Sequence, residues 1–199
     1  MSATFREYPM RYGLVALTLH WLIAAAIVAN LTIGLEFSDL PRSDPGKLPL
    51  FHLHASIGLT VLLLSLFRLF WRWANPVPPP PRGLSPWMRI AGRGMHHLFY
   101  FAIVVIPLAG WMMVSVGSGG RPIPYFGLFD WPAFPFLSGI GHAAAHPWHE
   151  AFETAHVWLA WMMIVLVPVH VLAALYHHFI RDDNVLLRML PFVHLRSGL

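Results

Sequence analysis

The chain has 199 residues, of which 57% are hydrophobic and only 11% are charged, and it contains no cysteine. Soluble domains usually carry about a quarter charged residues, so this composition excludes an ordinary water-soluble protein. The absence of cysteine excludes disulfides, iron–sulfur clusters and covalently attached haem. Although the net charge is +4, the scarcity of charged residues also excludes a nucleic-acid-binding protein.

Four windows lack Asp, Glu, Lys and Arg and are long enough to cross the roughly 30 Å core of a bilayer as helices. They cover residues 12–35, 48–67, 94–120 and 154–180. We therefore predict an all-α fold, an integral membrane four-helix bundle, as a single domain over residues 1–199. Its expected spans are roughly 12–35, 48–72, 94–117 and 152–180.

Two segments between the windows are predicted to lie outside the membrane. The proline-rich stretch 75–81 cannot continue a helix and predicts a stiff extended connector. The stretch 117–147 is rich in Gly, Pro and aromatic residues and predicts a long loop, whose aromatic side chains suit the headgroup boundary or pack over helix ends. His142 and His146 lie in this loop and His149 lies just after it. The three are candidates for a metal site but are expected to be solvated.

The basic residues predict how the spans are oriented. Ten of the 13 lie on one side of the spans, and Arg42, Lys47 and Arg121 lie on the other. Because basic residues in short loops favour the cytoplasm, both termini are expected to be cytoplasmic.

Four of the 13 histidines fall inside the predicted spans, where an unpartnered histidine costs free energy and is a functional candidate by default. His20 lies near the cytoplasmic end of the first span, and His54 lies near the opposite end of the second. The fourth span carries both His156 and His170, which are separated by about 21 Å and nearly four full turns, on one face. The depths therefore predict two bis-histidine sites, His20 with His170 and His54 with His156.

Haem fits these sites best, because a planar macrocycle in a helical bundle needs two axial imidazoles and an apolar pocket. Zinc normally takes three or four protein ligands, and the spans offer no nearby carboxylate. The small residues Ala24 and Gly58 would let a flat ring approach the backbone, although small residues also serve ordinary helix packing. A single buried histidine is more often a packing residue, but four at two matched depths favour ligation.

Several segments resemble the bacterial four-helix cytochrome b561 family over almost the whole chain. They are Leu19-His20-Trp21, Pro41-Arg42-Ser43-Asp44, His54-Ala55-Ser56-Ile57-Gly58 leading to Phe67-Arg68-Leu69, and the run from His170 to Phe179 followed by residues 183–191. The resemblance implies two non-covalent b haems with the same histidine pairing, in a bacterial inner membrane. The family often has Glu after the periplasmic histidine of the last helix, whereas here Val157 follows His156. His149-Glu150 offers that dipeptide, but only His156 keeps the fourteen-residue spacing to His170.

Members of this family pass electrons from a periplasmic donor to quinone, and some oxidise superoxide while reducing ubiquinone. His177 lies seven residues beyond His170 on nearly the same face, about 10 Å nearer the cytoplasm. It is a candidate to meet a quinone carbonyl, with Arg82 as a second candidate, and it could supply protons. The alternative is that His177 only ends a helix favourably as a C-terminal cation. For superoxide the outer loops are unfavourable, since they carry three basic against six acidic residues.

The resemblance thus implies a superoxide:ubiquinone oxidoreductase that uses two b haems in the lipid bilayer. Superoxide is the favoured donor, with another periplasmic donor left open. A second hypothesis is a cytochrome b anchor subunit that exchanges electrons between a partner dehydrogenase or hydrogenase and quinone. A third is a haem-free membrane scaffold or transporter with packing or proton-relay histidines.

Overall fold

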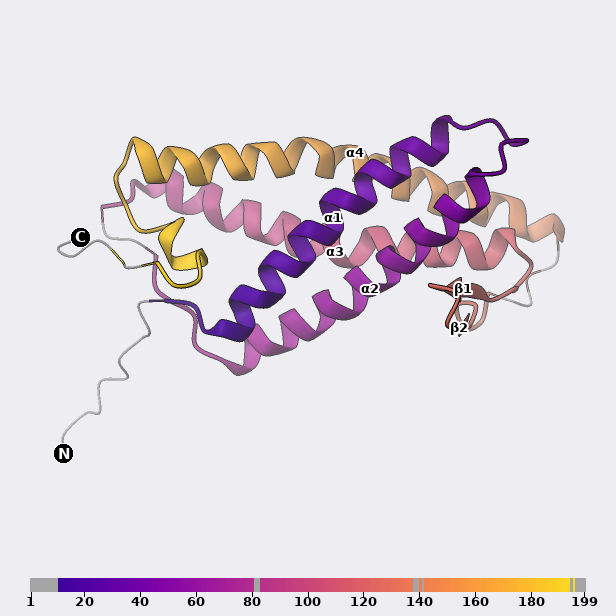
Figure 1. Ribbon diagram of the computed structural model, residues 1–199, viewed down its shortest axis with the longest axis horizontal. Coiled ribbons are helices and arrows are strands. Elements are labelled where there is room, and N and C mark those ends of the chain that lie inside the picture. Colours follow the sequence, from indigo (N-terminus) through magenta and orange to yellow (C-terminus); the bar gives the residue numbers. More distant parts are fainter. Residues whose placement is uncertain (1–10, 81–82, 138–139, 141, 194, 196–199) are drawn as a thin grey trace.

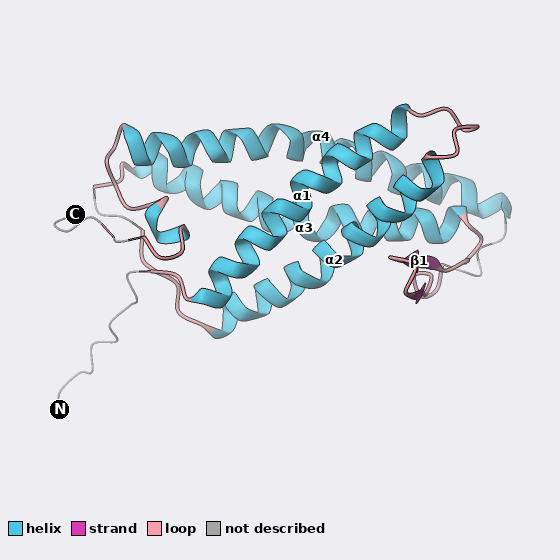
Figure 2. Cartoon of the chain, in the orientation of Figure 1, coloured by secondary structure: helices cyan, strands magenta, loops and turns pink. Residues whose placement is uncertain are grey.

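The computed structural model describes residues 11–80, 83–137, 140, 142–193 and 195, except for the side chains of residues 142–144, and most of these residues are helical (Figures 1 and 2). In chain order the elements are α1 (Leu14–Asp39), α2 (Lys47–Ala74), α3 (Pro86–Gly117), β1 (Ile123–Tyr125), β2 (Phe129–Trp131), α4 (His142–Phe179) and the 3-10 helix η1 (Leu187–Met189).

The four long helices run alternately up and down, and each packs on the next: α1 on α2, α2 on α3, and α3 on α4. We call the end where α1 and α3 begin and α2 and α4 finish the basic end. The arginines described there are Arg11, Arg68, Arg72, Arg89, Arg93, Arg181 and Arg188. The opposite end carries the β1–β2 hairpin and is called the hairpin end (Figure 1).

All four helices are long and apolar enough to cross a membrane. Their outward faces expose large apolar side chains such as Trp158, Val165 and Leu172, whereas Ile23 and Met163 are almost fully buried between them. An apolar outer surface on a helical bundle suits a lipid environment, because exposed apolar side chains contact lipid tails more favourably than water. The predicted four-helix membrane bundle is thereby confirmed.

Two helices begin earlier than the predicted spans. Helix α3 begins at Pro86, directly after Ser85, and proline is favoured at the first helical position because its missing N–H needs no partner there. Helix α4 begins at His142 and so includes residues 142–147, the last part of what was expected to be loop. His146 and His149 therefore lie on a helix rather than in a loop, and the prediction of a loop reaching residue 147 was wrong.

A short antiparallel hairpin, which the sequence did not predict, closes the hairpin end. Ser56 of α2 holds it in place: its hydroxyl accepts from the backbone N–H of Phe126 at 3.0 Å and lies 3.2 Å from the carbonyl of Pro124. One turn further along α2, Thr60 bonds the hydroxyl of Tyr125 at 2.9 Å. The hairpin is therefore fixed to α2 at this end of the bundle.

The chain that follows the hairpin packs on the end of α3. Phe134 donates its backbone N–H to the hydroxyl of Ser115 at 2.8 Å, and its ring lies 4.9 Å from that of Trp111. Trp131 also contacts Trp111, at 5.8 Å between ring centroids, whereas Phe136 is 96% exposed. Of the aromatic residues expected in this loop, Trp131 and Phe134 thus pack over a helix end.

Candidate functional site

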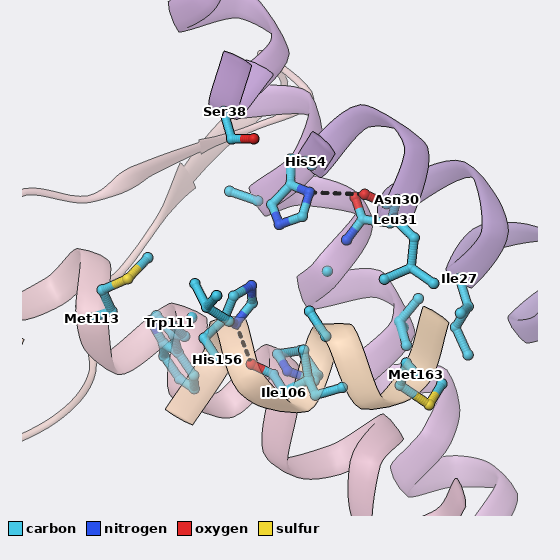
Figure 3. Close-up of a pocket in the computed structure, with 18 of the residues that line it drawn as sticks. Ile27, Asn30, Leu31, Ser38, His54, Ile106, Trp111, Met113, His156 and Met163 are labelled. Atoms are coloured by element: carbon cyan, nitrogen blue, oxygen red, sulfur yellow. Dashed lines mark hydrogen bonds between the residues drawn. The ribbon is translucent and has the colours of Figure 1, made fainter. Parts of the chain in front are cut away.

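At the hairpin end, His54 from α2 and His156 from α4 face each other across an open space (Figure 3). Their ring centroids lie 5.9 Å apart, with an interplanar angle of 73°. The Nδ1 of His54 lies 3.1 Å from the carbonyl oxygen of Asn30, and the Nδ1 of His156 lies 2.8 Å from that of Ile106. Since a carbonyl only accepts, both Nδ1 atoms carry the proton, which leaves both Nε2 atoms as acceptors or metal ligands.

The space between these rings belongs to a cavity of about 370 Å³ that all four helices line. Its walls are mainly apolar, and its volume lies in the range of about 300–1,000 Å³ that is typical of ligand pockets. Besides the two histidines, its polar lining comprises Asn30, Ser38 and Glu153. The cavity therefore suits a largely apolar ligand that two imidazoles hold.

Two glycines let the histidine rings lie close to neighbouring helices. A Cβ on Gly34 of α1 would lie 3.0 Å from Cε1 of His54, and a Cβ on Gly110 of α3 would lie 3.0 Å from Cε1 of His156. By contrast, a Cβ on Gly58 would meet only Asn30, at an ordinary 3.5 Å. The glycines beside the rings are thus Gly34 and Gly110, which sequence reasoning missed because they belong to other helices.

At the basic end, the structure brings together His20 from α1 and His170 from α4. Their ring centroids lie 6.3 Å apart, with an interplanar angle of 64°. Phe99 of α3 contacts His170 at 5.1 Å, and Arg68 of α2 lies 3.2 Å from Nδ1 of His20. Because arginine only donates, the Nδ1 of His20 accepts in this arrangement, and in a neutral ring its Nε2 carries the proton.

Both pairs have the spacing that one metal ion between two imidazoles requires. Two imidazole nitrogens that bind one metal from opposite sides, at about 2.0 Å each, would place their ring centroids about 6.3 Å apart, and the observed values are 5.9 and 6.3 Å. No group of three or more His, Cys, Asp or Glu that could hold a metal ion occurs among the described residues. The hairpin-end pair fits haem in both spacing and tautomer. The basic-end pair fits in spacing, and ligation through Nε2 of His20 requires the bond from Arg68 to break.

The two histidine pairs are separated by packed apolar side chains. Met163 of α4 is 2% exposed and packs with Ala102 and Ile103 of α3. Met163 also lines the hairpin-end cavity (Figure 3). The interior between the two pairs is therefore a tight apolar layer.

The other candidate residues are distributed as follows. His177 lies in the last turn of α4, with Nδ1 at 2.6 Å from Oδ2 of Asp183, while Arg82 lies outside the described residues. His149 lies beside Gly117 and 3.7 Å from Glu153, away from His54, so it is His156 that the structure places opposite His54. His146 pairs with Glu150 along the helix at 3.5 Å, and the side chain of His142 is outside the described part.

Four membrane-spanning helices with paired histidines at two depths define a class of protein: multi-pass membrane proteins built like b-type cytochromes. Residues 11–192 match the profile of the family described as prokaryotic cytochrome b561. The chain belongs to this family, whose proteins bind b-type haem and carry electrons across the membrane. It is accordingly a multi-pass protein of the bacterial inner membrane.

Three relatives are similar to the chain over nearly its whole length. Cytochrome b561 homolog 2 of Escherichia coli (strain K12) is 34% identical over 187 residues, which cover 94% of this chain and 95% of the relative. The protein named "Probable superoxide oxidase CybB" from Yersinia pestis is 27% identical over 182 residues, covering 91% and 96%. Cytochrome b562 of Cereibacter sphaeroides is 28% identical over 183 residues, covering 90% and 94%.

Proposed function

We propose that this protein holds two b haems and passes single electrons from superoxide, on the periplasmic side, to ubiquinone near the cytoplasmic side. His54 with His156 ligate one haem iron, and His20 with His170 ligate the other. The basic end faces the cytoplasm, in keeping with the location of ten of the 13 basic residues.

The observation that carries the proposal is the presence of two imidazole pairs, at 5.9 and 6.3 Å, at opposite ends of one apolar bundle. Helix α4 supplies one histidine to each pair, with about 21 Å between them along the helix. Such an arrangement suits stepwise electron transfer across a membrane, whereas two isolated packing histidines would need no partner at matching depth.

Haem iron in such a site supplies reversible one-electron chemistry. The balance is two superoxide ions, one quinone and two protons giving two dioxygen molecules and one quinol. Within this balance the chain's own residues orient the imidazoles through the carbonyls of Asn30 and Ile106, and the mainly apolar walls of the cavity suit the macrocycle. His177 donates a proton to the quinone at the basic end, and Arg82 is proposed as a second contact.

Superoxide as donor rests on the similarity to the relative named "Probable superoxide oxidase CybB". The outer loops, with three basic and six acidic residues, provide no general attraction for an anion, so any steering must be local. Arg42, in the loop between α1 and α2, is the candidate for local steering toward the hairpin-end pair.

The purified protein alone tests this proposal. We expect b-type absorption bands, two haems per chain, and quinol formation when superoxide is generated in the presence of a ubiquinone analogue. A protein with haem that forms quinol only with a co-purifying dehydrogenase would establish the anchor-subunit function instead. A protein without b-type bands would contradict both redox functions.

A further inference from the structure

The chain after α4 turns back and places a carboxylate against His177. Oδ2 of Asp183 lies 2.6 Å from Nδ1 of His177, and the backbone N–H of Asp183 donates to the carbonyl of His177 at 3.1 Å. Both side chains are largely buried, with 18% and 13% exposed. The second carboxylate oxygen accepts from the backbone N–H of Val185 at 3.0 Å, so the carboxylate is fixed at both oxygens.

The segment that carries Asp183 is itself fixed to the rest of the basic end. Arg181, which lies 3.5 Å from the same carboxylate oxygen, donates to the carbonyl of Gly83 at 3.1 Å. Arg188 donates to the carbonyl of Pro79 at 2.6 Å, and Trp21 of α1 donates to the carbonyl of Met189 at 2.7 Å. The segment is thus an ordered part of the fold, held by hydrogen bonds to α1 and to the connector between α2 and α3.

This geometry decides how His177 carries its protons. A carboxylate only accepts, so Nδ1 of His177 donates to Asp183 and Nε2 remains for another partner. A carboxylate at 2.6 Å from Nδ1 also stabilises the doubly protonated ring, in the way that the aspartate of a catalytic triad stabilises its imidazolium. His177 as a mere C-terminal helix cation would need no such buried partner.

We propose that Asp183 is the positioning residue that fixes the ring of His177 through Nδ1–H and compensates the charge of its imidazolium form, which donates the Nε2 proton to a quinone carbonyl oxygen at the basic end. This inference rests on the proposed function. As the quinone is reduced by electrons that arrive through the protein, the Nε2–H bond breaks and an O–H bond forms. His177 is left neutral, with its Nδ1–H still donated to the carboxylate of Asp183, and Nε2 regains a proton from cytoplasmic water.

Stopped-flow re-oxidation of the dithionite-reduced haem protein by a soluble ubiquinone analogue tests the proposal at this end alone. For Asp183→Asn we expect the maximal rate to fall about 10²-fold, the lower range for loss of general acid catalysis. The concentration of analogue at half-maximal rate should change less than about threefold, because an amide can still bond the ring but carries no charge. If the Asp183→Asn protein is re-oxidised at the wild-type maximal rate, the proposal is overturned.

Two further comparisons separate this role from a structural one. Asp183→Glu and Asp183→Gln have side chains of equal size, so a Glu variant at least about tenfold faster than the Gln variant supports the charge requirement, and equal rates overturn it. In a His177→Gln background, Asp183→Asn should lower the maximal re-oxidation rate by less than about a further twofold. If it lowers the rate as much as it does in the wild-type protein, Asp183 does not act through His177. Rates are expressed per haem, so that a smaller yield of folded protein in one variant does not alter its comparison with the isosteric variant.

The neighbouring carboxylate provides the matched control. Asp182 is exposed and has a backbone φ of 55°, a conformation that asparagine also adopts readily. The reduced Asp182→Asn protein should be re-oxidised at a rate within about twofold of the wild-type rate. A fall in rate equal to that of Asp183→Asn would overturn the proposal. If His177→Gln re-oxidises at the wild-type rate, the quinone site of the proposed function fails as well. If His177→Gln is slow and Asp183→Asn is not, only the present inference fails.

Discussion

The glycine beside His156 provides a quantitative test of the hairpin-end site. A Cβ added to Gly110 would lie 3.0 Å from both Cε1 and Nδ1 of His156. The ring is not free to turn away, since its Nδ1 bonds the carbonyl of Ile106 at 2.8 Å. Overpacking a tight interior costs about 1–3 kcal/mol. If this cost falls on the haem-bound form, the affinity for that haem decreases about fivefold to about 140-fold, at about 1.4 kcal/mol per factor of ten.

The assay for Gly110→Ala is titration of haem into the purified apo-protein, followed by the Soret band, together with the haem content of protein grown with limiting haem. Gly92→Ala on the same helix is the matched control, because a Cβ there would meet no atom within 4 Å. We expect the Gly110 variant to weaken one of two haems and the Gly92 variant to bind both normally. Unchanged affinity in Gly110→Ala, or equal weakening in the two variants, would refute the reasoning.

The remaining predictions concern the ligands, the hairpin and the quinone end. His156→Ala should lose one haem and keep the other, and His170→Ala should lose the other one, as read by haem content and by the α-band spectrum; two haems in either variant would contradict the pairing. Ser56→Ala removes the 1% exposed hydroxyl that accepts from Phe126, so the thermal midpoint in detergent should fall by the equivalent of about 1–3 kcal/mol. An unchanged midpoint would show that this bond does not hold the hairpin. His177→Ala should slow quinone reduction with both haem spectra intact, and an unaltered turnover would count against its role.

The bundle could be predicted from the sequence because its signals are local. Windows without charge identify the helices, and the fourteen residues between His156 and His170 place both on one face of α4 whatever the rest of the chain does. Depth within each span then suggested the partners His54 and His20. The structure places these partners at 5.9 and 6.3 Å.

Features that depend on the register between helices could not be predicted in this way. Gly110 lies on α3 and its importance arises only because α4 brings His156 against it. The hairpin strands have three residues each, too few for an alternating pattern, and Ser56 on a distant helix holds them. Asp183 meets His177 only because the chain turns back after α4. Such contacts are tertiary and leave little trace in local sequence.

Stopped-flow mixing of the oxidised, haem-loaded protein with superoxide tests the central claim most directly. The account predicts that superoxide reduces the haem bands, and that added ubiquinone analogue then re-oxidises them with formation of quinol. Haem bands that dithionite reduces but superoxide leaves oxidised would contradict superoxide as the donor.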